Sequence, residues 1–447
     1  MPTTATQRMK REDAPTLQAT ALDSPHETRV AFLCHAYHRG GVTRWMVDAA
    51  AELRKRGAAV WFVAPEPRTP FASGAGRPSV ASLVRDVPPE HRPELVARPV
   101  GTPFELGTHS YRTAMYAATV LSSVPAGTPI IVSDDEDVWA AAAGLSNAFP
   151  MIGILHADDP KYYALARAYG AQLAGCVAVS QRIARNAARE TSLSVDTIPC
   201  GVPMRPLGET RSNSQPFRIV WIGRVEEAQK RVSDLPRIAV ALRDRGVSFV
   251  LDVIGDGPQR SALEKQIDER GLHGLVRLCG WRDAESIWRQ LCASHVLILP
   301  SNYEGMPVVV MEALSAGCAV VASKVSGVED AAEDALAGRV LFTHEIGDIE
   351  GAVSQILRAI DIPERERRSL ARDSAARLFS IEVCIDRYEA VLGRIRTSAS
   401  TSRPLNPRPV LNGIFSLPLA VARAARRGLF AGNAKARAGG IAEPQRQ

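Results

Sequence analysis

The segment Asn302–Ser323 places two carboxylates eight residues apart around the start of an expected helix. It follows the apolar run Val296–Leu299, which is typical of a strand. Pro307 suits the first turn of a helix, where its missing N–H costs nothing. We therefore expect Glu304 in the loop just before the helix and Glu312 inside it.

The expected helix Val308–Leu314 is apolar all round apart from Glu312, and this pattern predicts burial. A buried carboxylate must be hydrogen-bonded or neutral, because otherwise it costs several kcal/mol. Ligand hydroxyls would satisfy it, and an arginine elsewhere in the core is the structural alternative. The free amides at the helix start, such as those of Met306 and Val308, would attract a phosphate.

A second cluster that can do chemistry is the basic pair Arg224 and Lys230, which follows the apolar run Arg218–Ile222. A phosphorylated ligand bound at this point would bring negative charge. Two fixed cations at a strand end would stabilise that charge without a metal. The alternative is a pair of solvated surface charges.

Two glycines, Gly40 and Gly41, follow the first expected strand and would let the backbone approach a phosphate at the start of the next helix. A plain tight turn is the alternative. The run Val253–Pro258 looks like a dinucleotide fingerprint but lacks its third glycine. A nicotinamide-dependent oxidoreductase is therefore disfavoured.

Short apolar runs alternate with helical patterns in two series along the chain. Near-continuous apolar strands that alternate with helices indicate parallel sheets covered on both faces. The turn-rich segment 203–216 separates the two series and predicts a linker. Ligands bind such sheets at the carboxyl ends of the strands, so two facing units would form a deep cleft. The expected strands are Val30–Cys34, Val60–Ala64, Pro129–Val132, Met151–Leu155, Cys176–Val179, Arg218–Ile222, Phe249–Ile254, Val276–Cys279, Val296–Leu299 and Ala319–Ala322.

The pattern E-G-M-P-x-x-x-x-E-A-x-x-x-G-x-x-V-x-x-S, which begins at Glu304, resembles the nucleotide-binding motif of retaining glycosyltransferases of the family-four type, which have the GT-B fold. The resemblance covers about residues 29–392. It implies that Glu304, with Gly305 beside it, contacts the transferred sugar near the reacting carbon, and that Glu312 holds the ribose hydroxyls. Many relatives read E-G-F-G, so Pro307 removes one possible amide donor.

Further residues match the same family one by one. The loop carrying Arg224 and Lys230 resembles its G-R-x-x-x-x-x-K loop, in which both cations bind the diphosphate. His156, directly after an expected strand, resembles the cleft histidine that touches the donor sugar, although a lone histidine is often structural. Asp158 and Asp159 are candidate acceptor contacts, with plain loop solvation as the alternative.

The glycine loops fit this resemblance as well. Gly40 and Gly41 stand where the family has its first-domain glycine loop, and Gly255 and Gly257 would line the nucleotide pocket. The residues predicted to bind the donor are Gly40, Gly41, Arg224, Lys230, Gly255, Gly257, Glu304, Gly305, Met306, Val308 and Glu312, and the catalytic set is Glu304, His156, Arg224 and Lys230.

Composition excludes several other classes of protein. No run of 18 apolar residues predicts a transmembrane helix, and the polar first 26 residues lack the apolar core of a signal peptide. Seven cysteines stand without a C-x-x-C pair, which argues against a disulfide framework or zinc site and favours the cytoplasm. No cluster of metal-binding spacing appears.

The net charge of +6 is concentrated at the C-terminus. Residues 398–447 hold eight Arg and Lys against one acid, +7, which leaves about −1 for the remainder. A near-neutral body disfavours nucleic acid as a partner. We hypothesise that residues 414–437 hold the enzyme at the anionic inner face of a membrane, with a disordered solubilising tail as the alternative.

The sequence therefore predicts an α/β chain with the GT-B fold, in which two Rossmann-like domains face an interdomain cleft. Its expected divisions are an arm at 1–26, an acceptor-side domain at 27–202, a linker at 203–216, a nucleotide-sugar-binding domain at 217–379, a helix at 380–397 that packs back on the first domain, and a basic tail at 398–447.

The resemblance implies transfer of a sugar, with retention of anomeric configuration, from a nucleoside-diphosphate sugar such as a UDP-sugar. The acceptor would be a glycan or lipid-linked saccharide of polysaccharide biosynthesis, and no cofactor or metal is expected. A sugar-nucleotide epimerase or a phosphorylase on the same fold is one alternative, which the pair Glu304 and Glu312 disfavours. A non-catalytic sugar-nucleotide-binding protein is another, and only turnover separates it.

Overall fold

The computed structural model describes residues 28–399 except 36–39, 65, 68–78, 98, 101–108, 133–134, 191–193 and 208–215. The arm expected at 1–26 and the tail segment expected at 414–437 lie outside the described residues. Within the described residues, no helix is long and apolar enough to cross a membrane.

The first domain is built on a seven-stranded parallel sheet in the order β4-β2-β1-β6-β7-β8-β9. A separate pair, β3 with β5, lies outside this sheet. The strands are β1 Arg29–Leu33, β2 Ala59–Val63, β3 Glu66–Pro67, β4 Glu94–Val96, β5 Pro99–Val100, β6 Ile130–Val132, β7 Met151–Leu155, β8 Leu173–Ala178 and β9 Val195–Thr197. The helices are α1 Gly41–Lys55, α2 Val80–Arg85, α4 His109–Ser123, α5 Glu136–Gly144, α6 Pro160–Tyr169 and α7 Gln181–Ala187, with 3₁₀ turns at Pro89–His91 and Gly170–Gln172.

The second domain has a six-stranded parallel sheet in the order β12-β11-β10-β13-β14-β15. Its strands are β10 Phe217–Ile222, β11 Phe249–Ile254, β12 Val276–Gly280, β13 Val296–Leu299, β14 Ala319–Ser323 and β15 Leu341–His344. The helices are α8 Asp234–Asp244, α9 Arg260–Glu269, α10 Ala284–Ala293, α11 Val308–Ser315, α12 Val328–Ala332, α13 Ile349–Asp361 and α14 Glu364–Phe379, with a 3₁₀ turn at Ala337–Arg339. The last helix, α15 Ile381–Ala399, follows α14 and packs on the first domain.

The apolar patterns explain these elements. The central strands β7, β13 and β14 are buried along their whole length, as parallel strands covered on both faces must be. Helix α1 buries a stripe that includes Met46, Ala50 and Leu53, and it ends before Gly57, whose φ of +87° favours glycine. The strands expected from the sequence agree with the observed ones within three residues at either end.

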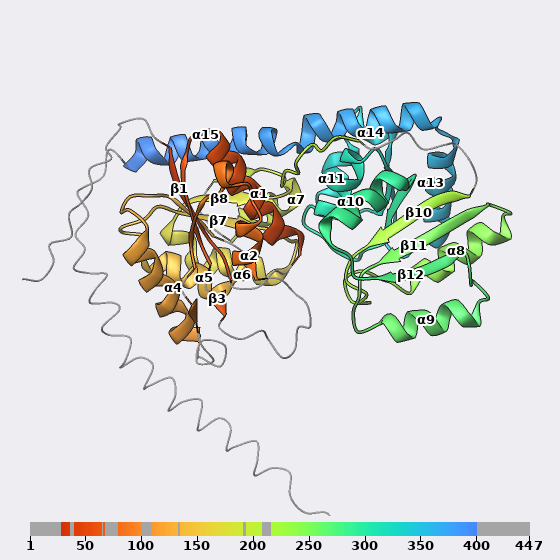
Figure 1. Cartoon of the computed structure of the whole chain (residues 1–447), viewed down its shortest axis with the longest axis horizontal. Helices are drawn as coiled ribbons and strands as arrows, with labels where there is room; N and C mark the ends of the chain where they lie inside the picture. The colour runs from red at the N-terminus through yellow and green to blue at the C-terminus, as the bar shows by residue number, and fades with distance from the viewer. Residues whose placement is uncertain are drawn as a thin grey trace, which may run out of the picture.

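The chain crosses between the domains twice, first through the linker after Val202 and then between α14 and α15. The two crossings are joined by hydrogen bonds. The backbone N–H of Val202, where the linker begins, donates to the carbonyl of Phe379 at 2.8 Å. The N–H of Ile381, at the start of α15, donates back to the carbonyl of Val202 at 3.0 Å. Figure 1 shows α14 over the second domain and α15 continuing along the first.

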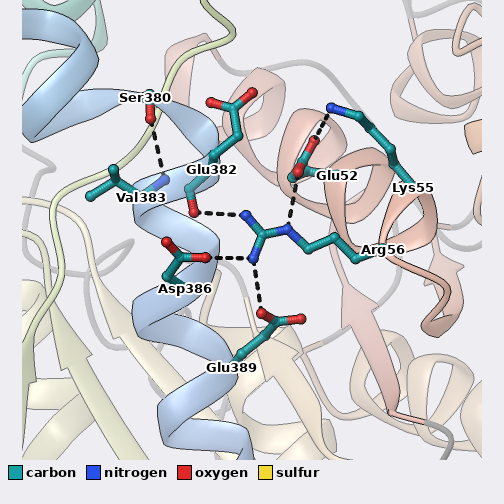
Figure 2. A network of polar contacts seen from close by, with 8 residues as sticks. All are labelled: Glu52, Lys55, Arg56, Ser380, Glu382, Val383, Asp386 and Glu389. Carbon is teal, nitrogen blue, oxygen red and sulfur yellow. Dashed lines mark hydrogen bonds and ion pairs between the residues drawn. The ribbon is translucent and has the colours of Figure 1, made fainter.

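An arginine at the end of α1 holds α15 on the first domain (Figure 2). The guanidinium of Arg56 donates to Asp386 at 2.7 Å, to Glu389 at 2.8 Å and to the carbonyl of Glu382 at 2.9 Å. It also pairs with Glu52 of its own helix at 3.0 Å. Helix α15 is thus tied by charge-assisted hydrogen bonds to the first domain while its start belongs to the second crossing.

Helix α11 departs from the sequence expectation in two respects. Pro307 lies at the N-cap, one residue before the first helical turn. The helix is not buried all round, because Val308, Val309 and Glu312 are only half-buried. Residues 308, 312 and 315 share one face, as positions four and three apart do on a helix, and this face lines a pocket beside α1.

Candidate functional site

The strand order of the second sheet reverses between β10 and β13, which are neighbours in the sheet but not in sequence. The strands after β10 are added first on one side of it and then, from β13, on the other. Loops that follow two such strands diverge and leave a crevice where ligands bind in open α/β sheets. Lys230 lies in the loop after β10, and Glu304 lies in the loop after β13. Both of these predicted site residues therefore lie at the switch point of the sheet.

These two side chains form an ion pair in which Lys230 Nζ lies 2.6 Å from Glu304 Oε1. The lysine side chain is 14% exposed and the carboxylate 7%. Gln229 joins them, because its side-chain amide donates to the carbonyl of Tyr303 at 3.2 Å and to Glu304 Oε2 at 3.3 Å. The sequence analysis missed Gln229, because a single glutamine beside a lysine has no distinctive pattern.

The first domain meets the Glu304 loop through its backbone. Ala157 and Gly305 form an antiparallel bridge, and the N–H of Asp158 donates to the carbonyl of Glu304 at 3.3 Å. A Cβ built on Gly305 would lie 1.7 Å from the carbonyl oxygen of His156. Only glycine fits at this position, because any side chain would push the two domains apart.

His156 follows β7 directly, as expected, and is buried. Its ring packs edge-on against Trp45 of α1 at 5.5 Å between centroids, and its Nδ1 lies 4.0 Å from Cys200 Sγ. The backbone of His156 thus faces Gly305, while its ring is held between α1 and the segment that leads to the linker.

Arg224 does not share the enclosed position of Lys230. Its side chain is 58% exposed, and its guanidinium pairs with Glu226 at 3.1 Å in the same loop. The two predicted cations therefore differ in this structure: Arg224 is exposed and pairs with the half-buried Glu226, whereas Lys230 is enclosed with a buried carboxylate, and their predicted contact with a diphosphate stays a prediction. A long, exposed side chain such as that of Arg224 remains free to change rotamer.

The Gly40–Gly41 turn faces the start of α11 across the domain boundary. Gly40 has a φ of +111°, which favours glycine. A Cβ on Gly41 would lie 2.8 Å from Val308 Cβ. The N-termini of α1 and α11, where unpaired amides favour anions, therefore lie next to each other.

Gly255 and Gly257 serve close packing between two loops of the second domain. A Cβ on Gly255 would lie 1.8 Å from the carbonyl oxygen of Gly223, and one on Gly257 would lie 2.4 Å from that of Val225. These contacts place the loop after β11 directly on the loop after β10, which carries Lys230. Their predicted contact with a nucleotide stays a prediction.

Met306 completes the Glu304 loop and is buried. It packs below Gly327, where a Cβ would lie 2.9 Å from the Met306 sulfur and 2.3 Å from the carbonyl oxygen of Gly305. The Glu304 loop is thus packed against Gly327 of the second domain on one side and against the backbone of His156 of the first domain on the other.

Glu312 faces a cavity of about 70 Å³ between α1, α10, α11 and the linker. Burial and the nearby charge of Asp48 raise the pKa of its carboxyl to about 7, although Arg44 and Arg205 act in the opposite direction. Burial also raises the pKa of Asp48, which Arg44 pairs at 3.1 Å. The residue as a whole is half-buried, but its carboxyl group is enclosed and shares its pocket with charges of both signs.

The two aspartates after His156 have structural partners. Asp159 caps α6 by accepting from the N–H of Lys161 at 2.9 Å. Asp158 accepts from the hydroxyl of Tyr163 and from Asn186, which draws it into the first domain. These contacts favour the structural interpretation of both side chains.

No group of three or more His, Cys, Asp or Glu in the described part of the chain is placed to hold a metal ion. The seven cysteines are all free thiols.

A second contact between the domains adjoins the Glu304 loop at Ser326, the residue before Gly327. Ser180 Oγ and Ser326 Oγ are 2.6 Å apart, and the N–H of Gln181 donates to Asp330 at 2.7 Å. Helix α7 therefore meets α12 while the Glu304 loop meets the end of β7. With these contacts the two domains enclose Lys230 and Glu304 in the boundary between them.

Comparison with known proteins relates part of this chain to proteins that transfer sugars. Residues 216–361 match the family model described as "Glycosyl transferases group 1". The alpha-D-kanosaminyltransferase of Streptomyces kanamyceticus is 29% identical over 177 residues, 40% of this chain and 45% of that protein. The amylovoran biosynthesis glycosyltransferase AmsK of Erwinia amylovora is 30% identical over 150 residues, 32% and 36% of the two chains. The chain thus spans less than half the length of these curated relatives.

Among solved structures, HepE of Anabaena in complex with UDP superposes with a TM-score of 0.64 at 18% identity, covering 82% of this chain and all of that one. The GT-B fold expected from the sequence is confirmed by this likeness.

Proposed function

We propose that this chain, whose second domain is a group 1 glycosyl transferase domain in a GT-B fold, transfers a sugar from a nucleoside-diphosphate sugar to an acceptor hydroxyl. The observation that carries the proposal is the enclosed pair of Lys230 and Glu304 at the switch point of the second sheet. A cation and a carboxylate at this point can each bind one end of a sugar diphosphate. The ammonium would take the phosphate oxygens, and the carboxylate would take the sugar.

The diphosphate would displace the Glu304 carboxylate as the partner of Lys230. Charge that develops on the leaving diphosphate would then be stabilised by the ammonium and by the amides at the starts of α1 and α11. Arg224, exposed beside Glu226, would turn inward to add a second cation. Glu304 would be released to accept hydrogen bonds from sugar hydroxyls, and Glu312 from the ribose.

The reaction we propose retains the anomeric configuration. The bond between the anomeric carbon and the diphosphate oxygen breaks, and the acceptor oxygen bonds to the same face of that carbon. The acceptor proton passes to the departing diphosphate, so no side-chain base is required. The donor would be a hexosyl nucleotide, and the acceptor a glycan or lipid-linked saccharide bound by the first domain.

Two other functions make different predictions. An epimerase would convert the nucleotide sugar without an acceptor, and a phosphorylase would require inorganic phosphate. A non-catalytic sensor would bind the nucleotide sugar without turnover. The names of the relatives, which are transferases acting on sugars, favour transfer over each of these.

Nucleoside diphosphate binding gives the first test. One among UDP, GDP and ADP should raise the Tm of the full chain in EDTA, because a ligand at about 100 times its Kd stabilises the folded state by roughly 2.7 kcal/mol. The Lys230→Gln variant should lose most of that shift. Equal shifts in the variant and the parent would place the diphosphate elsewhere, and no shift with any of the three would contradict the proposal.

We further propose that the basic tail, which lies outside the described residues, brings the enzyme to an anionic membrane. Each Arg or Lys near such a surface contributes about 1 kcal/mol, so several suffice for reversible binding. The full chain should sediment with anionic but not neutral vesicles, less so in high salt. A chain truncated after Ala399 should stay in solution. Equal binding by both would exclude the tail as the membrane contact.

A further inference from the structure

Arg231, which directly follows Lys230, has a φ of +48°. Among the residues that the structure describes, every other one at positive φ is a glycine. An arginine in the left-handed region carries a strain of about 1–2 kcal/mol, because its Cβ crowds the backbone. Such strain persists only where the surroundings hold the residue in place.

The guanidinium of Arg231 is held by two partners from different segments. Its Nε donates to Asp234 Oδ2 at 2.7 Å, and its Nη1 donates to Asn302 Oδ1 at 3.2 Å. The Asp234 side chain is 1% exposed, so this charge-assisted bond is sheltered from water. Gly347 leaves room for the group, because a Cβ there would lie 2.9 Å from Nη2.

Asn302 continues the connection into the Lys230 loop. Its backbone N–H donates to the carbonyl of Gln229 at 2.7 Å, and its side-chain amide donates to the carbonyl of Ala228 at 2.9 Å. Residues 228–231 are thus joined to residues 302–304 by hydrogen bonds from both backbone and side chains. These are the two segments that carry Lys230 and Glu304.

We infer that Arg231 is a positioning residue for the proposed sugar transfer. Its left-handed backbone lets two successive side chains reach the same opposing segment: Lys230 reaches Glu304, and Arg231 reaches Asn302. The two loops are then one rigid unit. When the diphosphate replaces Glu304 as the partner of Lys230, the Arg231–Asn302 contact keeps the loops of Lys230 and Glu304 in the same relative position. The inference rests on the proposed function, since it assigns a role within that same site.

A merely structural role predicts a different outcome from the same substitution. Glycine is the residue that the φ of +48° favours, so Arg231→Gly relieves the strain while it removes the side chain that contacts Asp234 and Asn302. If the side chain served local stability alone, the variant would change Tm and leave turnover intact. If it positions the loops, turnover falls while the fold remains.

The test compares full-length variants by Tm, by kcat and KM for the donor, and by nucleoside diphosphate affinity. Arg231→Gly should lower kcat by about ten- to a hundred-fold, the effect of misplacing reacting groups by up to 1 Å, with a smaller fall in Tm, because Asp234 keeps Arg237 as a partner. Arg231→Lys keeps the positive charge but cannot contact Asp234 and Asn302 at the same time, so its kcat should lie between those of Arg231→Gly and the parent. Millimolar guanidinium chloride should partly rescue Arg231→Gly and not the parent.

Arg237→Ala is the matched control, because Arg237 also pairs with Asp234, at 2.9 Å, but this pair lies within α8 and does not join the two loops. It should keep full kcat. Arg231→Asn, which also tolerates the left-handed region, replaces glycine if that variant fails to fold. Parental kcat in Arg231→Gly would overturn the inference alone, whereas no turnover in the parent would overturn the proposed function and this role with it.

Discussion

Replacing Glu304 by glutamine should lower kcat by about a hundred- to a thousand-fold, because a charge aimed at the reacting centre is typically worth about 2.7–4 kcal/mol in the transition state. Glutamine is preferred to alanine because Lys230 is enclosed with this carboxylate at 2.6 Å. Alanine would leave the ammonium without its partner and confound loss of rate with loss of stability. An amide oxygen still accepts from Lys230 and keeps the loop in place.

Initial rates of transfer and donor hydrolysis, measured beside Tm, check this expectation. The matched control is Glu264→Gln on the exposed face of α9, outside the cleft-forming loops, which should keep full activity. Lys230→Gln should weaken donor binding as well as rate, and the double variant should lose less than the two single losses added together, because the pair acts as a unit. Near-parental kcat in Glu304→Gln would remove Glu304 from the reacting centre.

The parts of the fold that follow from local pattern were predictable from the sequence. β7, β11 and β13 have the predicted bounds, because their apolar runs end sharply at a polar, glycine or proline residue. The loops of Lys230 and Glu304 were placed correctly after their strands. β15 was not predicted, because Leu341–His344 is short and contains two polar residues.

Contacts between segments distant in sequence could not be predicted. The bridge between Ala157 and Gly305 depends on how closely the domains approach, which no local pattern reports. The same holds for Arg231, whose left-handed backbone is set by Asp234 and Asn302 together. A lone arginine after a lysine gives no sign of positive φ, and glycine would have been the expected residue there.

The pocket around Glu312 was the other feature beyond sequence reasoning. The apolar helix pattern predicted a buried carboxylate, but the facing residues come from α1 and the linker. Asp48 and Arg44 lie 264 and 268 positions before Glu312 in the numbering, and their charges act on it in opposite directions. Only the packed domains reveal that this carboxylate has an unusual environment.

Glu312 should make the stability of the protein fall as pH rises from about 4.5 to about 7. Its carboxyl has a pKa raised from the ordinary 4.5 to about 7 by burial and by Asp48. Below 4.5 both the folded and the unfolded chain hold the proton, so no penalty arises. Between the two values the unfolded chain has lost it while the folded chain keeps it, so the free energy of unfolding decreases with pH. Above 7 the accumulated penalty is at most about 3 kcal/mol.

Glu312→Gln removes that penalty and should raise the free energy of unfolding at pH 8 by up to about 3 kcal/mol, with little change at pH 4.5. Denaturant unfolding across this pH range measures it. Asp48→Asn is the companion variant, and it should move the decline in stability to lower pH, because it removes the charge that raises the Glu312 pKa. The proposed ribose contact predicts that Glu312→Gln also loses about fivefold in nucleoside diphosphate affinity, since a hydrogen bond to a charged group is worth about 1 kcal/mol more than one to a neutral group. A variant both more stable and weaker in binding would show that this carboxylate is kept for the ligand at the expense of the fold, whereas lower stability at pH 8 would mean that Arg44 and Arg205 hold it ionised.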